Sequence, residues 1–174
     1  IQLFQLEGEG GESFYDYYLQ ALDCGWHVAP TVGQDNHHGN WGDEGLSRTG
    51  VLAKELTEGA LYEAMAARRV YATEDPDFYV DYRLNGNLMG SVMGAAEGLE
   101  ASVVLYDATD GPEALVEVIG AGGAVLASGS TADGTLSLSV PAGSPYYFLW
   151  ISQPDGDAAM TAPVWVDDFA DMGI

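Results

Sequence analysis

"FYVDYRLNG", residues 78–86, carries the clearest structural signal in this sequence. Apolar side chains at positions 78, 80, 82 and 84 alternate with the charged side chains of Asp81 and Arg83. A period of two with one polar face is typical of a half-buried β-strand. The pair Asn85-Gly86 that follows closes tight turns, because both residues accept a positive φ. The segment therefore predicts a strand over 78–84 that ends in a tight turn.

The chain on either side of this strand repeats the pattern. Alternation, complete or nearly so, recurs in "LEASVVLY" (99–106), "EALVEVI" (113–119) and "TLSLSV" (135–140), and "YYFLWIS" (146–152) is apolar throughout, as in a central strand. Asp133-Gly134 is a second tight-turn pair, and "GAGG" (120–123) joins two more strands. Seven or eight short strands of this kind predict an immunoglobulin-like β-sandwich, which we assign to residues 76–174.

Residues 1–75 have a different pattern. Apolar positions spaced three and four apart predict helices over 13–25, begun by Ser13 and closed by Gly25, and over 57–69, begun by Thr57. Short apolar runs predict strands at 1–6, 26–32, 48–54 and 70–72. This alternation is the order of a parallel α/β unit. A complete (β/α) barrel takes about 250 residues, so residues 1–75 correspond to one sector of such a barrel. The start of the sequence has the character of the middle of a protein.

The charge balance excludes some functions. The 174 residues include 27 acidic and 5 basic ones, for a net charge of −22. Such a surface repels the phosphates of nucleic acids and anionic membranes, so neither is an expected partner. The favoured explanation is a solubilising acidic surface, as in secreted or salt-adapted proteins, and a field that attracts cations is the alternative. Cys24 is the only cysteine, which excludes an internal disulfide and a thiolate zinc site. The location in the cell stays open, with an extracytoplasmic or secreted one slightly favoured.

"GQDNHHGNWG" (33–42) concentrates residues with metal-binding chemistry. In an extended segment Asp35 and His37 point to the same side, so an oxygen and a nitrogen donor converge on one ion. This donor pair suits zinc, manganese or iron. Turn formation is the alternative, because aspartate, asparagine, histidine and glycine are also turn residues. A catalytic zinc site needs about three protein ligands, so Asp35 and His37 would need ligands from elsewhere.

The other candidate ligands near this loop are expected to have different roles. His38 would point away from His37 in an extended segment, so it is expected to be solvated or to contact a ligand rather than the metal. His27 within the strand is expected to pack or to form a hydrogen bond rather than to bind a metal. Asp43 and Glu44 are expected to be solvated loop residues.

Two longer runs resemble a known family: "GWHVAPTVGQDNHHGNWG" (25–42) and "SRTGVLAKELTEGALYEAMAARRVYATEDPDFYVDYRLNGNLMGS" (47–91). They are similar to the C-terminal part of PHP-domain metal-dependent hydrolases (the polymerase and histidinol phosphatase superfamily), and more closely to the CehA/McbA-type branch. The resemblance implies that residues 1–75 form the C-terminal sector of a distorted (β/α)7 barrel, followed by the sandwich. The fold class expected is thus α/β plus all-β.

The same resemblance assigns roles to residues of this chain. Asp35 and His37 match the last Asp-x-His ligand pair of the family, and Asn40 and Trp41 would line the pocket. Arg48 matches an arginine that could contact an anionic substrate, and a structural salt bridge is the alternative. The remaining ligands have no counterpart here, so they would lie in a missing N-terminal part of the same protein. Alone, the chain is expected to be inactive and its divalent metal site to be empty.

Three functions follow from these observations. The first is a metal-dependent phosphoesterase or related esterase that uses metal-activated water on a small-molecule ester. The second is a carbohydrate- or protein-binding sandwich without catalysis, with an aromatic platform formed by Tyr146, Tyr147, Trp150 and Trp165; a core role for these rings is the alternative. The third is a structural role for the sandwich. An open edge of the barrel sector predicts pairing with the missing part or with a second copy in a homo-oligomer.

Overall fold

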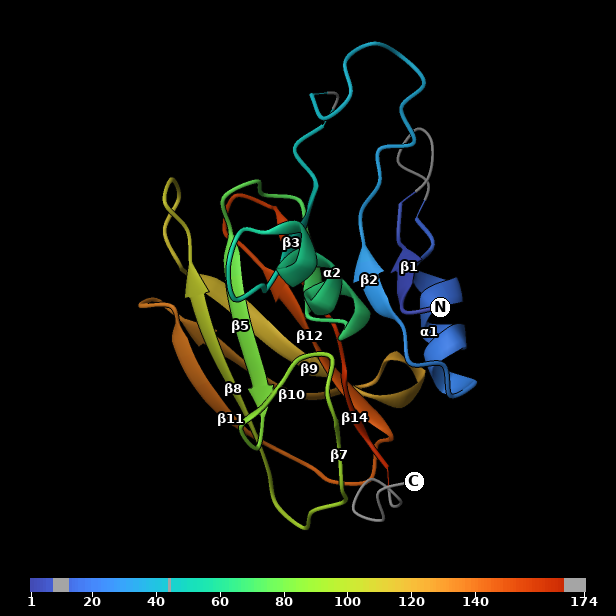
Figure 1. The fold of residues 1–174 in the computed structure, drawn as a ribbon. Coiled ribbons are helices and arrows are strands. Elements are labelled where there is room, and N and C mark those ends of the chain that lie inside the picture. Colours follow the sequence, from blue (N-terminus) through green and yellow to red (C-terminus); the bar gives the residue numbers. More distant parts are fainter. Residues whose placement is uncertain (8–12, 44, 168–174) are drawn as a thin grey trace.

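The computed structural model describes residues 1–7, 13–43 and 45–167 (Figure 1). Strands make up 42% of it and helices 13%. Two sheets face each other across one apolar core, and a unit with one helix packs beside the larger sheet. The protein is therefore an all-β fold of the sandwich type.

The larger sheet has eight strands. Its main path is β10 (Val125–Thr131), β9 (Ala114–Ile119), β12 (Tyr146–Ser152), β13 (Ala158–Thr161), β4 (Val70–Thr73) and β3 (Arg48–Val51). β14 (Val164–Val166) pairs with the first residues of β12, and β7 (Val92–Met93) pairs with β14. β12 lies inside this sheet and is almost wholly buried, as its apolar sequence predicts.

The smaller sheet has four strands in the order β11 (Thr135–Val140), β8 (Leu99–Tyr106), β5 (Tyr79–Leu84) and β6 (Asn87–Leu88). The alternation predicted for β5 is confirmed, because Val80, Tyr82 and Leu84 are completely buried. The Tyr82 hydroxyl donates to the Tyr147 carbonyl, 3.2 Å away in β12. This bond joins the two sheets inside the core.

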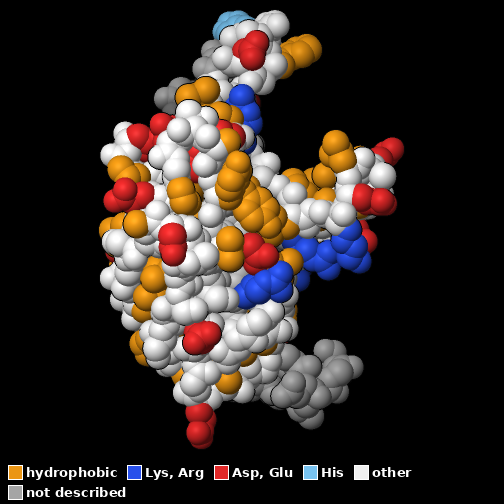
Figure 2. All heavy atoms as spheres, turned by 90° about the vertical axis from the view of Figure 1, so that its left-hand side faces the viewer, with side chains coloured by type: hydrophobic (Ala, Val, Ile, Leu, Met, Phe, Trp, Pro, Cys, Tyr) orange, Lys and Arg blue, Asp and Glu red, His pale blue; other side chains and the backbone are white. Residues whose placement is uncertain are grey.

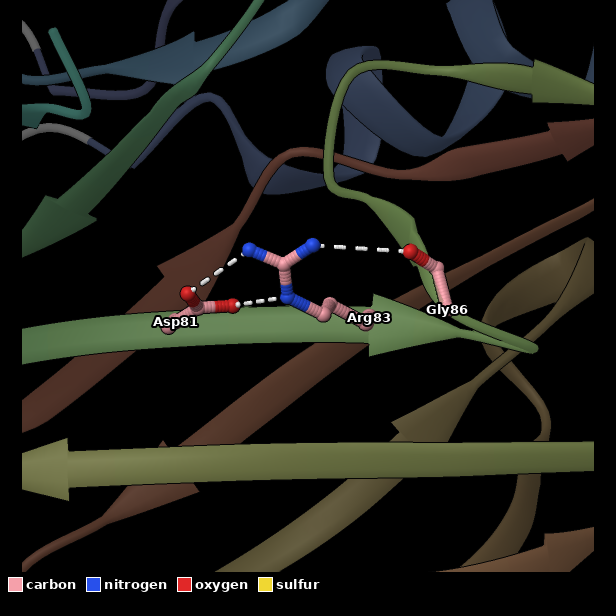
Figure 3. Close-up of polar contacts among 3 residues, drawn as sticks. All are labelled: Asp81, Arg83 and Gly86. Carbon is pink, nitrogen blue, oxygen red and sulfur yellow. Dashed lines mark hydrogen bonds and ion pairs between the residues drawn. The ribbon is translucent and has the colours of Figure 1, made fainter. Parts of the chain in front are cut away.

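The turn after β5 has the predicted geometry. Asn85 has φ of 47° and Gly86 has φ of 79°. Arg83 holds the turn to the strand: Nε and Nη2 lie 3.0 and 3.1 Å from the two carboxylate oxygens of Asp81, and Nη1 lies 3.5 Å from the Gly86 carbonyl (Figure 3). Both charged side chains are on the solvent face of the strand, as the sequence predicts.

The first part of the chain forms a small β–α–β unit. β1 (Leu3–Gln5) pairs in parallel with β2 (Ala29–Thr31), and α1 (Tyr15–Asp23) connects them. Tyr18 and Leu22 of α1 are buried in an apolar cluster that includes Phe148 of the larger sheet. The carboxylate of Asp23 accepts hydrogen bonds from the Tyr146 hydroxyl (2.7 Å) and the Gly122 amide (3.0 Å), which attaches the end of the helix to the sandwich.

The predicted barrel sector is wrong. The expected order of strands and helices is present, with α2 (Glu58–Ala66) between β3 and β4. However, β3 and β4 are antiparallel neighbours, with Arg48 opposite Thr73 and Val51 opposite Val70. A (β/α) barrel needs parallel strands, and the described residues contain no barrel. The expectation of an α/β fold for this part is replaced by an all-β fold.

The proposed division of the chain at residue 75 stays a prediction. β4 pairs with β13, so residues from both sides of that boundary share one sheet.

Within the described ranges, no helix is long and apolar enough to cross a membrane.

Candidate functional site

The segment from Val32 to Ser47, called the Asp35 loop below, connects β2 with β3 and projects beyond the two sheets (Figure 1). Asp35 and His37 are both exposed in it. Histidine side chains, in pale blue, stand at the top of Figure 2, at the tip of this projection. The two predicted ligands are thus presented to solvent, away from the core.

Thr49 fixes the point at which the loop begins. Its Oγ1 lies 2.9 Å from the Val32 amide nitrogen, from which it accepts, and 3.2 Å from the Val32 carbonyl, to which it donates. The hydroxyl therefore takes the place of a backbone partner for Val32, next to the last residue of β2.

Arg48 fixes the returning half of the loop. Its Nη1 donates to the carbonyls of Gly45 (2.8 Å) and Ser47 (2.9 Å), and its Nη2 donates to the carbonyl of Gly42 (3.0 Å). Gln34 reaches the same Gly45 carbonyl from the other half of the loop, at 2.9 Å. The base of the loop is thus held by side-chain bonds to its backbone.

The tip of the loop is a polar turn. The Asn36 amide group donates to the Asn40 Oδ1 (3.0 Å), and Asn36 Oδ1 accepts from the His38 backbone amide (2.6 Å). Asp35 has φ of 46°, so the backbone is not extended there and the same-side argument from strand geometry does not apply. Trp41, predicted to line a pocket, is 78% exposed.

The other predicted roles can be placed on the structure. His27 stacks on the Trp165 ring with 4.7 Å between centroids, and burial is the main cause that lowers its pKa. This confirms a packing role. His38 and Asp43 are exposed, and Glu44 lies outside the described residues. For Arg48, the ion pairs found among the described residues do not include its guanidinium group, whose Nη atoms bind carbonyl oxygens.

The aromatic residues considered as a glycan platform belong to the core. Tyr146, Tyr147 and Trp165 are buried, and Trp150 is partly buried with its ring against Tyr15. These rings do not form an exposed surface.

Basic side chains gather beside a hollow on the face shown in Figure 2. Lys54, Arg69 and Arg83 line it. Glu63 lies 3.5 Å from both Lys54 and Arg69, and Asp81 pairs with Arg83. Because acidic neighbours offset these charges, the hollow is a weak candidate for an anion site.

Sequence reasoning missed one group of side chains. Asp75, Asp77 and Asp107 offer ligand atoms within 4.8 Å of one another, and no other such group of three was found in the described ranges. It includes neither Asp35 nor His37. The only local sign of this cluster in the sequence is Asp-Pro-Asp at 75–77, and that stretch coincides with the predicted domain boundary.

Comparison with protein-family models, curated proteins and solved structures found no match to this chain.

Proposed function

We propose that this chain contributes metal ligands to the catalytic centre of a metal-dependent hydrolase that acts on a phosphoester or a related ester. The observation that carries the proposal is the Asp35 loop, whose base is fixed by Arg48 and Thr49 while Asp35 and His37 remain exposed. The similarity of residues 25–42 to PHP-domain hydrolases supports the same assignment. The barrel is not part of the proposal.

The side chains of Asp35 and His37 are of the types that bind catalytic metals, but two ligands are fewer than such a metal needs. Carboxylate oxygen and imidazole nitrogen suit zinc, manganese or iron, and a catalytic zinc ion takes about three protein ligands. A divalent ion held there would supply Lewis acidity and lower the pKa of a water molecule. The contribution of this chain is to supply two donors on a loop whose base is held by Arg48 and Thr49.

The remaining ligands would come from a partner, either another part of the same protein or a second copy. The β1–β2 pair supports this, because parallel sheets are normally larger and covered on both faces. Among the described residues β1 pairs only with β2. An unpaired strand edge is a ready site for a further strand.

The test is hydrolysis of p-nitrophenyl phosphate and of a p-nitrophenyl carboxylic ester by the complete gene product, with Mn²⁺ or Zn²⁺ added after chelator treatment. Asp35→Asn and His37→Ala are expected to lower the metal-dependent rate by more than about a hundredfold. Mutation of residues that only hydrogen-bond to metal ligands already lowers metal affinity or activity by about 10–100-fold. His38→Ala is the matched control and should keep the rate. Hydrolysis that needs no metal, or that survives Asp35→Asn, would disprove the proposal.

A further inference from the structure

The three carboxylates of Asp75, Asp77 and Asp107 lie at one end of the sandwich, far from the Asp35 loop in the sequence. Asp75 and Asp77 belong to the connection between β4 and β5, and Asp107 directly follows β8. Gln153 directly follows β12 and joins them: its Nε2 lies 3.0 Å from Asp107 Oδ2 and 3.3 Å from Asp75 Oδ2. Three connections, which serve strands of both sheets, therefore meet here.

The backbone turns use one oxygen of each buried carboxylate and leave the other for the cluster. Asp75 Oδ1 accepts from the Asp77 amide at 3.0 Å. Asp107 Oδ1 accepts from the amides of Thr109 (2.8 Å) and Asp110 (3.0 Å). The third carboxylate, Asp77, is exposed and accepts from the Thr109 hydroxyl at 2.8 Å. The oxygens of Asp75 and Asp107 that remain are both directed toward Gln153.

These charges lack a compensating cation. Asp75 and Asp107 are only 4% and 6% exposed, and the ion pairs of the described residues involve none of the three carboxylates. Like charges buried close together are unfavourable without a cation or a proton. Burial is the main cause that raises the pKa of Asp75. Further carboxylates lie at this end of the sandwich. Burial is the main cause that raises the pKa of Asp157, and the negative charges of the neighbouring Asp155 and Asp110 raise it further.

Gln153 provides an independent observation. The residue is 6% exposed, and its Oε1 is buried without a hydrogen-bond partner. In this structure Nε2 is the end of the amide group that is directed at Asp75 and Asp107, and a half-turn of the group would exchange Nε2 and Oε1. Oε1 would then face the oxygens of Asp75 and Asp107, which is repulsive unless a cation lies between them. With a cation in that place, Oε1 becomes a fourth oxygen ligand.

We propose that Asp75, Asp77, Asp107 and Gln153 bind one calcium ion, which links the two sheets of the sandwich. The donors are all oxygen atoms, which suits calcium or magnesium rather than zinc. Calcium accepts several protein carboxylates at 2.3–2.6 Å, whereas magnesium usually keeps several waters and binds one or two carboxylates. Ligand atoms within 4.8 Å of one another can all contact one calcium ion. The site is independent of the proposed hydrolase function.

The experiment measures calcium binding by isothermal titration and thermal unfolding of the chelator-treated chain in about 0.15 M KCl, which screens diffuse attraction by its acidic surface. One saturable calcium ion per chain is expected. Calcium at a hundred times its dissociation constant should raise Tm by roughly 5–10 °C, and magnesium should raise it less.

Asp107→Asn is expected to abolish both the saturable binding and the Tm shift, because Asn keeps the Oδ1 acceptor of the turn and removes the charge. Asp77→Asn, at an exposed position, gives the same result should the first variant fold poorly. Glu100→Gln is the matched control: it removes one charge from the opposite end of the same strand, and its Tm shift should equal that of the wild type. Absence of saturable calcium binding, or equal shifts in wild type, Asp77→Asn and Glu100→Gln, would overturn the proposal.

Discussion

Thr49 Oγ1 bonds to both backbone groups of Val32, at 2.9 Å from the nitrogen and 3.2 Å from the oxygen. One hydroxyl thus connects the end of β2 to β3, where no backbone pairing between these strands is present. Together with Arg48, it determines where the Asp35 loop begins and ends. Two adjacent residues of β3 therefore position a loop that extends well beyond the sheets.

Thr49→Val should lower the free energy of unfolding by about 1–2 kcal/mol, because it leaves both backbone groups of Val32 without this partner. Urea denaturation measures the loss. Thr49→Ser keeps the hydroxyl and should lose less than half as much. A loss in Thr49→Ser as large as that in Thr49→Val would contradict this, because it would show that the methyl group contributes as much as the two hydrogen bonds.

Gly50 lies under the ring of Tyr71, its partner in β4, and a Cβ added at Gly50 would overlap that ring. Gly50→Ala should therefore destabilise the fold by about 3 kcal/mol, since a packed core has no room for the shift. Gly59→Ala is the contrast, because Gly59 lies in α2 and a Cβ there meets nothing within 4 Å. It should stabilise by about 0.5–1 kcal/mol. Urea denaturation of both variants should give opposite signs; the same sign would contradict this packing.

The metal-ligand role of Asp35 and His37 predicts that neither residue supports the fold. Both are exposed in the loop. Asp35→Asn, which keeps a residue that tolerates positive φ, and His37→Ala should each leave the free energy of unfolding within about 0.5 kcal/mol of the wild type. A larger loss in urea denaturation would assign these residues a structural role, and a loss of activity in the variants would then not demonstrate ligation.

The sequence predicts local features of this fold well. Thr57 accepts from the Ala60 amide at 3.4 Å at the start of α2, and Gly25, with φ of 82°, follows α1. Ser13, predicted to begin α1, is not its N-cap residue; the helix begins at Tyr15, with Phe14 at the cap. Helix periodicity and strand alternation are properties of neighbouring residues, so a local pattern reveals them.

Strand direction could not be predicted in this way. All four residues of β4, Val70–Thr73, are buried, and a fully buried strand has the same apolar sequence in a parallel or an antiparallel sheet. Its antiparallel partners β3 and β13 depend on contacts distant in the sequence. The carboxylate cluster was missed for the same reason, because Asp77, Asp107 and Gln153 come from three separate connections.

Alkaline pH should destabilise the protein through its buried tyrosines. Burial is the main cause that raises the pKa of Tyr71 to about 12, whereas an unfolded tyrosine ionises near 10. The folded chain therefore holds this proton more tightly, so its contribution is complete below about pH 10 and is lost toward pH 12. The loss is about 1.4 kcal/mol per pH unit for one tyrosine.

Tyr71→Phe isolates this contribution. The Tyr71 hydroxyl donates to the Phe78 carbonyl at 2.8 Å, so the variant should be about 1 kcal/mol less stable at pH 8. Above about pH 10 the wild type loses stability faster, and the two curves should cross roughly one pH unit higher. Parallel curves, measured by urea denaturation at each pH, would show that Tyr71 ionises as readily in the folded chain as in the unfolded one.

The calcium proposal predicts that the stabilisation by calcium is lost as pH falls, whereas the contribution of Tyr71 is lost as pH rises. Burial raises the pKa of Asp75, and the Thr109 hydroxyl bond lowers the pKa of Asp77. Without calcium, the raised pKa means that the folded chain holds the Asp75 proton more tightly than the unfolded chain does. The resulting stabilisation is complete below the pKa that Asp75 has in the unfolded chain, and it is lost as pH rises through its pKa in the folded chain. Calcium binds only the charged form, so its stabilisation should be complete near pH 7.5 and should weaken as pH falls toward about 4.5.

The measurement is the difference in Tm with and without calcium at each pH, for wild type and for Glu100→Gln, which lacks one charge outside the cluster. Asp107 lies beside Asp75, and Asp110, Asp155 and Asp157 lie at the same end of the sandwich. Protonation of any of them also weakens the attraction of the ion, so all act in the same direction. The shift should shrink equally in the two proteins. A calcium shift that stays constant down to about pH 4.5 would mean that the ion binds groups other than these carboxylates, since protons compete for the same oxygens.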